Sequence, residues 1–138
     1  MQLSAAVLAV LAALAAPILA DTVSFDTVYD DPSTSLDEVA CSDGPNGLIT
    51  KGFTTFGSLP TKNIGGAAAV AGFNSPQCGS CWELTFNGTS INVLAIDHAG
   101  SGFNIAEGAM NALTNNQAAF LGRVDATATQ VDASACGL

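Results

Sequence analysis

A chain of 138 residues is long enough for one compact domain, and this one carries three basic against twelve acidic side chains, a formal net charge of −9. So acidic a protein repels nucleic acid and anionic membranes, and partners of both kinds are therefore excluded. The sequence contains no internal repeat, linker or low-complexity tract that would divide the chain.

Residues 1–20 are predicted to be a secretory signal peptide. They contain no charged side chain and a long run of alanine, leucine and valine that ends at Pro17-Ile18-Leu19-Ala20. This pattern favours cleavage after Ala20 and a secreted domain of residues 21–138. The alternative is a membrane anchor, because residues 3–20 are just long enough to span a bilayer, but this run has no basic flank to hold it there.

The first half of the secreted part is predicted to hold few regular elements. Residues 22–29 alternate apolar and polar side chains, which is typical of a strand, and residues 36–41 form at most one irregular turn. Residues 48–56 are predicted as a second strand. Residues 67–73 are ambiguous, since alanine favours a helix but the flanking glycines leave only a short run. Glycine, proline, serine and asparagine mark the loops between these segments: residues 30–33, 42–47 and 57–66.

A hairpin is expected in the middle of the chain, where Asn87-Gly88 separates two apolar runs, residues 83–86 and 90–97. Asn-Gly favours a two-residue turn because both residues tolerate a positive φ. The second run is apolar on both faces, which indicates a strand buried on both sides, as in a small barrel. Asn87-Gly88-Thr89 is also the only N-glycosylation sequon in the chain, so Asn87 is a candidate glycosylation site.

The last third is predicted to contain helix followed by strand. Residues 99–102 are a glycine loop, residues 106–113 a helix, and residues 117–121 a further helical turn that stops at Gly122. Residues 123–131 alternate and are predicted as a strand. Many short strands with one or two short helices indicate a mainly β protein built as a small barrel.

Four cysteines fit an oxidising compartment, where an even count implies two bridges: Cys41, Cys78, Cys81 and Cys136. A Cys78–Cys81 bridge would give the tight ring of a redox enzyme, but no basic residue lies near Cys78 in the sequence to lower a thiol pKa. Structural pairing instead joins each of these two cysteines to one of the outer ones. The wide spacing lacks the paired ligands of a structural zinc site, so neither a metal nor another cofactor is expected.

Several motifs follow one another in a specific order: Val23-Ser24-Phe25-Asp26-Thr27-Val28-Tyr29-Asp30, Val39-Ala40-Cys41-Ser42-Asp43-Gly44, Asn46-Gly47-Leu48-Ile49-Thr50, Cys78-Gly79-Ser80-Cys81-Trp82, Asn92-Val93-Leu94-Ala95-Ile96-Asp97-His98-Ala99-Gly100-Ser101-Gly102-Phe103-Asn104 and Cys136-Gly137. In this order and with these cysteine spacings, residues 23–138 resemble the cerato-platanin family of small secreted fungal proteins.

The resemblance implies a six-stranded double-ψ β-barrel with disulfides Cys41–Cys78 and Cys81–Cys136. It also implies a secreted or wall-bound protein that binds chitin-type oligosaccharides, loosens cellulosic material without cutting it, self-associates at surfaces and elicits plant defence. The partners that it implies are chitin or N-acetylglucosamine oligomers, cellulosic wall polysaccharides and the plant host surface.

The same barrel resembles the first domain of expansins and the barrel of certain endoglucanases, which bears on whether the protein is an enzyme. The motif that holds the general acid in those hydrolases falls on Gly102-Phe103-Asn104. An asparagine has no acidic proton to donate, and glycoside hydrolysis needs two carboxyl groups. No catalytic residue is therefore assigned. The alternative is an extracellular hydrolase that uses Asp97 with Asp26 or Asp30.

The candidate carbohydrate site is a shallow groove formed by Thr27, Tyr29, Asp97 and Asn104, which would supply hydrogen-bonding and stacking groups. Thr27 and Tyr29 fall where expansins carry Thr-x-Tyr, and Asp97 falls on a retained acidic position. Two of these residues have a structural alternative: Asp97 could cap the loop of residues 100–102, and Tyr29 could be a half-buried strand residue.

Other distinctive residues are interpreted as structural. His98 is the only histidine and lacks a companion metal ligand or nucleophile. Trp82 follows a bridged cysteine and is expected in the core rather than as a sugar platform. Residues 65–73 are wholly uncharged. This run is expected to be buried barrel or, with Phe53 or Phe56, to form an exposed apolar patch that drives self-association.

Overall fold

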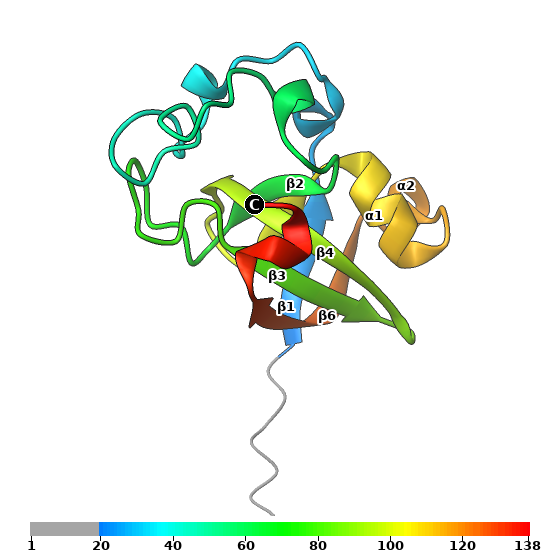
Figure 1. Ribbon diagram of the computed structural model, residues 1–138. Helices are drawn as coiled ribbons and strands as arrows, with labels where there is room; N and C mark the ends of the chain where they lie inside the picture. Colours follow the sequence, from blue (N-terminus) through cyan, green and yellow to red (C-terminus); the bar gives the residue numbers. More distant parts are fainter. Residues whose placement is uncertain (1–19) are drawn as a thin grey trace, which may run out of the picture.

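The computed structural model describes residues 20–138. The predicted signal peptide, residues 1–20, lies outside the described residues except for Ala20. Across the described part, six strands close into one barrel and short helices lie beside it (Figure 1). No helix within this part combines the length and the apolar character that crossing a membrane requires.

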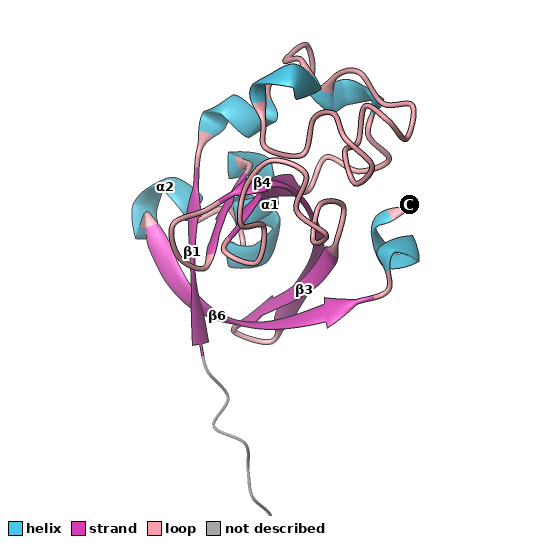
Figure 2. Cartoon of the chain, turned by 90° about the vertical axis from the view of Figure 1, so that its left-hand side faces the viewer, coloured by secondary structure: helices cyan, strands magenta, loops and turns pink. Residues whose placement is uncertain are grey.

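The strands follow one another around the barrel in the order β1-β5-β2-β4-β3-β6. Figure 2 shows β6 next to β1 in this closed sheet. Two neighbouring pairs are parallel, β1 with β5 and β2 with β4, and the other pairs are antiparallel. This closed, mainly β barrel confirms the predicted fold class. The elements are β1 (Ala20–Phe25), β2 (Ile64–Ala67), β3 (Cys81–Phe86), β4 (Thr89–His98), β5 (Phe103–Ile105), β6 (Arg123–Val131), α1 (Glu107–Thr114) and α2 (Ala118–Leu121), with 3-10 turns at Thr27–Asp30, Leu36–Glu38, Phe56–Ser58 and Ala133–Cys136.

The predicted hairpin is confirmed as β3 and β4. Phe86 pairs with Thr89 across the turn, and both turn residues have positive φ, 46° at Asn87 and 79° at Gly88. The residues from Val93 to Ile96 are all buried, so β4 is covered on both faces as its apolar pattern predicts. β4 lies between β2 and β3 and is the longest strand of the barrel.

Two disulfides join the hairpin region to distant parts of the chain. Cys41 is bonded to Cys78 and Cys81 to Cys136, as the family resemblance implies. The first bridge fixes the long loop region that follows β1, and the second fixes the C-terminal 3-10 turn against β3. All four cysteines are buried.

The strand predicted for residues 22–29 ends earlier, at Phe25. The carboxylate of Asp26 accepts the backbone N–H of Val28 at 3.0 Å, and the chain turns there into the 3-10 helix η1 (Thr27–Asp30). An aspartate that bonds its own backbone two residues further on favours a turn over a strand. Alternation of apolar and polar residues does not reveal this competition.

The strand predicted for residues 48–56 is wrong. This stretch folds back on itself, because the backbone N–H groups of Lys51 and Phe53 both donate to the carbonyl of Leu48 at 3.1 Å. Leu48 is fully buried and packs into the core from a loop, and its own N–H donates to the carbonyl of Cys41 at 3.0 Å.

Strand β2 lies largely where residues 57–66 are predicted to form a loop. It runs between β4 and β5, and a Cβ on Gly65 would lie 2.4 Å from the carbonyl oxygen of Asn104. Glycine therefore lets three strands approach closely. Judged by composition alone, the same glycines indicate a loop. The chain leaves the barrel after Ala67, and no helix forms in the ambiguous stretch of residues 67–73.

The C-terminal third agrees closely with its sequence pattern. The predicted helices appear as α1 and α2, and the predicted strand at residues 123–131 is β6 at both ends. Asn115, with a left-handed φ of 56°, ends α1, and Gly122, with φ 68°, ends α2. A positive φ at this position ends a helix because the backbone no longer continues the hydrogen-bond ladder.

Candidate functional site

Asp97 joins three segments of the chain at the end of β4. Its Oδ2 accepts the hydroxyl of Tyr29 at 2.9 Å, and its Oδ1 accepts the backbone N–H groups of Ala40 at 3.0 Å and His98 at 2.9 Å. The interpretation that Asp97 caps the loop of residues 100–102 is therefore wrong. This carboxylate instead holds η1 and the segment before Cys41 against the barrel.

Tyr29 is a buried residue rather than an open platform. Its exposed fraction is 8%, and its ring centroid lies 6.0 Å from that of Phe56. Burial, followed by the negative charge of Asp97, raises the pKa of the Tyr29 hydroxyl well above its usual value. The neutral hydroxyl is the form that donates to Asp97, so the pair is stable as Asp⁻ with protonated tyrosine.

The Tyr29–Asp97 contact predicts a loss of stability at high pH. In the unfolded chain the tyrosine ionises near pH 10, whereas the folded state keeps the proton to a higher pH. The stabilisation that Tyr29 contributes to the fold is thus fully present below about pH 10 and is lost as the pH rises beyond it. Because the chain has one tyrosine, ultraviolet absorbance of tyrosinate reports it directly.

We expect tyrosinate absorbance to appear only together with unfolding. Tyr29→Phe should remove the absorbance signal and lower the free energy of unfolding at pH 7 by about 2 kcal/mol, since a hydrogen bond to a charged acceptor is lost. Its stability should also fall less steeply above pH 10 than that of the wild type. A normal tyrosine titration in the intact fold would contradict the buried pairing.

The two other acids considered for hydrolysis also bind backbone donors. Asp30 accepts the N–H groups of Glu107 at 2.7 Å and Gly108 at 2.9 Å, so it caps the N-terminus of α1 from a distant part of the chain. The residue at the N-cap position, Ala106, has no side-chain acceptor. Asp26 caps η1 through the N–H of Val28.

Asn104 and Thr27 differ in their surroundings. The Oδ1 of Asn104 accepts the hydroxyl of Ser24 at 3.1 Å, and Asn104 is half-buried on β5. In the barrel Gly66 pairs with Asn104 on one side and with Asp97 on the other. The structure therefore brings three predicted site residues into one region, while Thr27 is exposed on η1.

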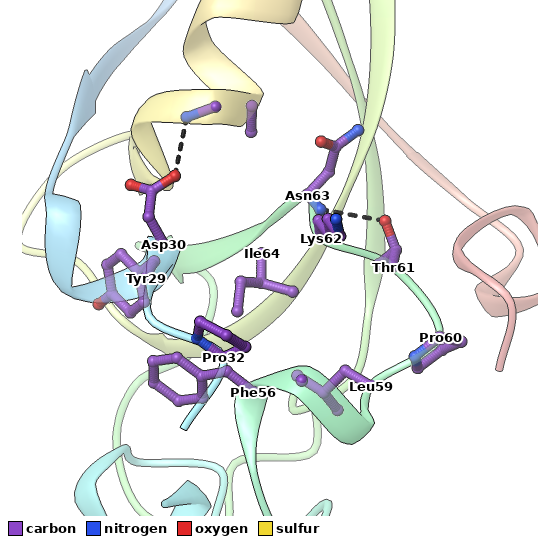
Figure 3. Close-up of a pocket in the computed structure, with 13 residues that line it drawn as sticks. Tyr29, Asp30, Pro32, Phe56, Leu59, Pro60, Thr61, Lys62, Asn63 and Ile64 are labelled. Carbon is purple, nitrogen blue, oxygen red and sulfur yellow. Dashed lines mark hydrogen bonds between the residues drawn. The ribbon is translucent and has the colours of Figure 1, made fainter. Parts of the chain in front are cut away.

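A groove lies on the other side of Tyr29, between η1, the segment that leads into β2 and the start of α1 (Figure 3). Its volume is about 610 Å³. The floor is made by the buried side chains of Phe56, Leu59 and Ile64. Around this floor lie prolines and polar groups: Pro32, Pro60, Asp30, Thr61, Lys62 and Asn63.

Of the four predicted site residues, only Tyr29 lines this groove. Most of its wall lies in residues 57–66, which the sequence pattern predicts only as a loop, so the pattern does not identify these residues as a site. The available signal was the mixture of proline with Thr61, Lys62 and Asn63, which supplies rigid apolar faces next to hydrogen-bonding groups.

The two residues interpreted as structural make intramolecular contacts. The Nδ1 atom of His98 lies 2.6 Å from the carbonyl oxygen of Val70, although the residue as a whole is exposed. The Nε1–H group of Trp82 donates to the hydroxyl of Ser80 at 2.8 Å, and its ring meets Phe103 edge-on at 5.6 Å. Within residues 20–138, no group of three metal-ligating side chains comes together.

The fold and the site define a class: a small β-barrel protein with two disulfides, a buried Tyr–Asp pair and an open groove. The cerato-platanin family model matches residues 21–138, and the chain belongs to the cerato-platanin family.

Proteins similar to the chain agree with this assignment. It is 50% identical over 126 residues to the heat-stable 19 kDa antigen of Coccidioides immitis, covering 90% of this chain and 86% of that protein. The crystal structure of cerato-platanin 3 from M. perniciosa has a TM-score of 0.85 and 48% identity, over 87% of this chain and 100% of that one. The solution structure of the fungal elicitor cerato-platanin has a TM-score of 0.75 and 39% identity, over 83% and 95%.

Proposed function

We propose that the protein is a secreted, non-catalytic fungal protein that binds cell-wall oligosaccharides of the chitin type in the groove beside Tyr29. The observation that carries this proposal is the composition of the groove. The exposed rings of Pro32 and Pro60 give it apolar surface over the buried Phe56, Leu59 and Ile64, next to polar side chains such as Asn63. Sugar rings have apolar faces and polar edges, so they need both kinds of surface in one site.

The acetamido group of N-acetylglucosamine suits this groove in particular. Its methyl group can rest on the prolyl surface of Pro32 or Pro60, both exposed, while its amide meets Thr61 or Asn63. The groove is open rather than enclosed, so only part of each sugar loses its water. Binding of modest strength is therefore expected.

The use of the acids supports binding without hydrolysis. A hydrolase needs one carboxyl group to donate a proton and another to act as base or nucleophile. Both oxygens of Asp97 and both of Asp30 already accept intramolecular donors, and Asp26 caps η1. Asn104 stands at the position of the general acid in the related hydrolases, which leaves the alternative enzyme without a proton donor there.

Binding and cleavage are tested together by mixing the protein with chitin hexamer. We expect saturable binding and no increase in reducing ends. Lys62→Ala and Asn63→Ala should each weaken binding several-fold, because a hydrogen bond is worth about 1 kcal/mol. Lys51→Ala is the matched control, since it removes another exposed lysine that lies outside the groove.

Two results would contradict the proposal. Steady release of reducing ends by the purified protein, abolished in Asp97→Asn, would restore the hydrolase alternative. Unchanged affinity in both groove variants would move the oligosaccharide away from this groove, and the region of Asp97 and Asn104 would then be the remaining candidate.

Further activities follow from family membership and are part of the same proposal. The relative whose structure is described as a fungal elicitor supports recognition of this protein at the plant host surface. The likeness to the first domain of expansins supports loosening of cellulosic material without cutting. Loosening would be measured as loss of filter-paper cohesion without release of sugar. Recognition by the plant would be measured as defence responses of leaves to the purified protein.

Self-association is proposed to arise from the loop after β2. Ala68, Ala69 and Ala71 are exposed there and Phe73 is 66% exposed, whereas Val70 is buried. The run of residues 65–73 is thus divided between barrel and surface. Phe56 is buried, so it does not add to the exposed part. An exposed apolar loop favours adsorption to an air–water interface.

We expect surface activity and light scattering to be greater at pH 4 than at pH 7, because the sequence pI is 4.1 and charge repulsion falls there. Phe73→Ser should reduce both signals. Phe120→Ser, which removes an 88% exposed phenylalanine on α2, serves as the comparison and should have less effect. Equal surface activity of wild type and Phe73→Ser at both pH values would rule out this loop.

A further inference from the structure

We propose that Asn87 carries an N-linked glycan whose inner N-acetylglucosamine units lie in a cleft between the β3–β4 hairpin and helices α1 and α2. The proposal rests on the secretion included in the proposed function, because N-glycosylation takes place in the secretory compartment. It concerns a different surface from the oligosaccharide groove.

The acceptor is accessible and unengaged. Asn87 and Thr89 are both exposed at the tip of the hairpin, and the nearby hydroxyls of Thr85 and Ser90 bond each other at 2.7 Å rather than the Asn87 carboxamide. The other Asn-Gly pair provides a contrast. Asn46 is not followed by the required hydroxyl residue, and its amide donates to the carbonyl of Asn74 at 3.1 Å.

The transfer requires an oligosaccharide donor linked to a polyprenyl diphosphate. The Nδ2 atom of Asn87 forms a bond to C1 of the first sugar while the bond from C1 to the diphosphate oxygen breaks. Nδ2 loses one proton, and the polyprenyl diphosphate leaves. The hydroxyl of Thr89 completes the sequon that the transferring enzyme recognises.

A cleft of about 550 Å³ begins at this acceptor. It falls within the roughly 300–1,000 Å³ typical of small-ligand sites. Phe86 and Leu121 give it half-buried apolar surface, and the exposed side chains of Asn115 and Gln117 supply amide groups. Attachment decides the occupant, because a sugar bonded to Asn87 has its first ring at the edge of the cleft.

The cleft and the groove lie at opposite ends of α1. Gly108 and Ala109 line the groove, whereas residues 112–115 line the cleft. A glycan in the cleft therefore leaves the groove open to chitin oligomers. The same glycan covers Phe86 on its outer side, which should stabilise the hairpin against the helices.

Occupancy is tested by expressing residues 21–138 behind a yeast secretory leader and measuring the intact mass of the secreted protein before and after peptide:N-glycosidase treatment. Wild type and Thr89→Ser, which keeps the sequon, should carry a glycan. Thr89→Ala and Asn87→Gln should carry none. Wild-type protein secreted without a glycan would overturn the proposal. A parallel expression with residues 1–20 tests secretion by the natural leader separately.

The place of the glycan is tested by thermal unfolding. Protein trimmed to one N-acetylglucosamine should have a higher Tm than the same sequence made without glycan in bacteria. This glycan-dependent difference should be lost in Phe86→Ala and kept in Phe120→Ala, because Phe120 does not line the cleft. If the protein trimmed to one sugar and the protein without any glycan had the same Tm, the glycan would project into solvent. The cleft assignment would then fail.

Discussion

Replacing both Cys81 and Cys136 by alanine should lower the free energy of unfolding by about 4 kcal/mol. The bridge spans a sequence separation of 55 residues, and closing so long a loop removes much of the conformational entropy of the unfolded chain. In a domain of this size the change corresponds to a fall in Tm of roughly 15 °C. Removal of Cys41 and Cys78, with a separation of 37 residues, should have a similar effect.

Thermal and denaturant unfolding of the wild type and the two paired variants provide the measurement. The reduced wild type is the matched control, since it loses both bridges without any substitution and should be less stable than either variant. A Tm within a few degrees of the wild type for the Cys81/Cys136 variant would show that the barrel does not depend on the bridge. With both bridges intact, we expect marked heat resistance of this domain.

Gly65→Ala should also cause a large loss, about 3 kcal/mol or more, because it overpacks the barrel against main-chain atoms. The added Cβ would lie 2.4 Å from the carbonyl oxygen of Asn104 and 2.6 Å from the Cα of Ile105. Neither atom belongs to a flexible side chain, so β5 itself would have to move. Separation of β5 from β2 would disturb the region that holds Asn104 and Asp97.

Gly100→Ala is the matched control for this prediction. A Cβ at that position meets no atom within 4 Å, and its backbone lies outside the left-handed region. The control should therefore change stability by less than about 0.5 kcal/mol. Denaturant unfolding measures both variants. If Gly65→Ala and Gly100→Ala had the same stability, the requirement for glycine at position 65 could not come from close packing of β2 between its neighbours.

The sequence predicts those elements in which local preference and tertiary packing agree. Asn87-Gly88 has a strong local preference for a tight turn between two strands, and β4 is apolar on both faces because the barrel covers both. Strand β6 and helix α1 likewise show their own periodicity. The fold as a whole could be predicted because the family motifs imply its topology and its disulfide pairing.

The errors occur where distant contacts decide the structure. Gly65 and Gly66 indicate a loop by composition, yet β2 needs them because two neighbouring strands leave no room for a side chain. β5 has three residues and is defined by its partners β1 and β2 rather than by a pattern of its own. The loop character of residues 48–56 depends on hydrogen bonds to Leu48 and Cys41 that no periodicity records.

The site was predictable only in part for the same reason. Tyr29 and Asp97 are 68 residues apart in sequence, and motif comparison placed both in one region, where they form a hydrogen bond. Their mutual contact makes them a support for the fold beneath the groove. Lys62 and Asn63 belong to no motif. Only the folded structure shows that they line the same groove as η1 and the start of α1.

Backbone NMR during a titration with chitin hexamer tests oligosaccharide binding at this groove most directly. We expect progressive shifts of the amide signals of residues 61–64 and of η1, with signals at the hairpin tip unchanged and the hexamer still intact at the end. The absence of shifts at saturating oligomer, or shifts confined to surfaces away from the groove, would contradict the proposed site.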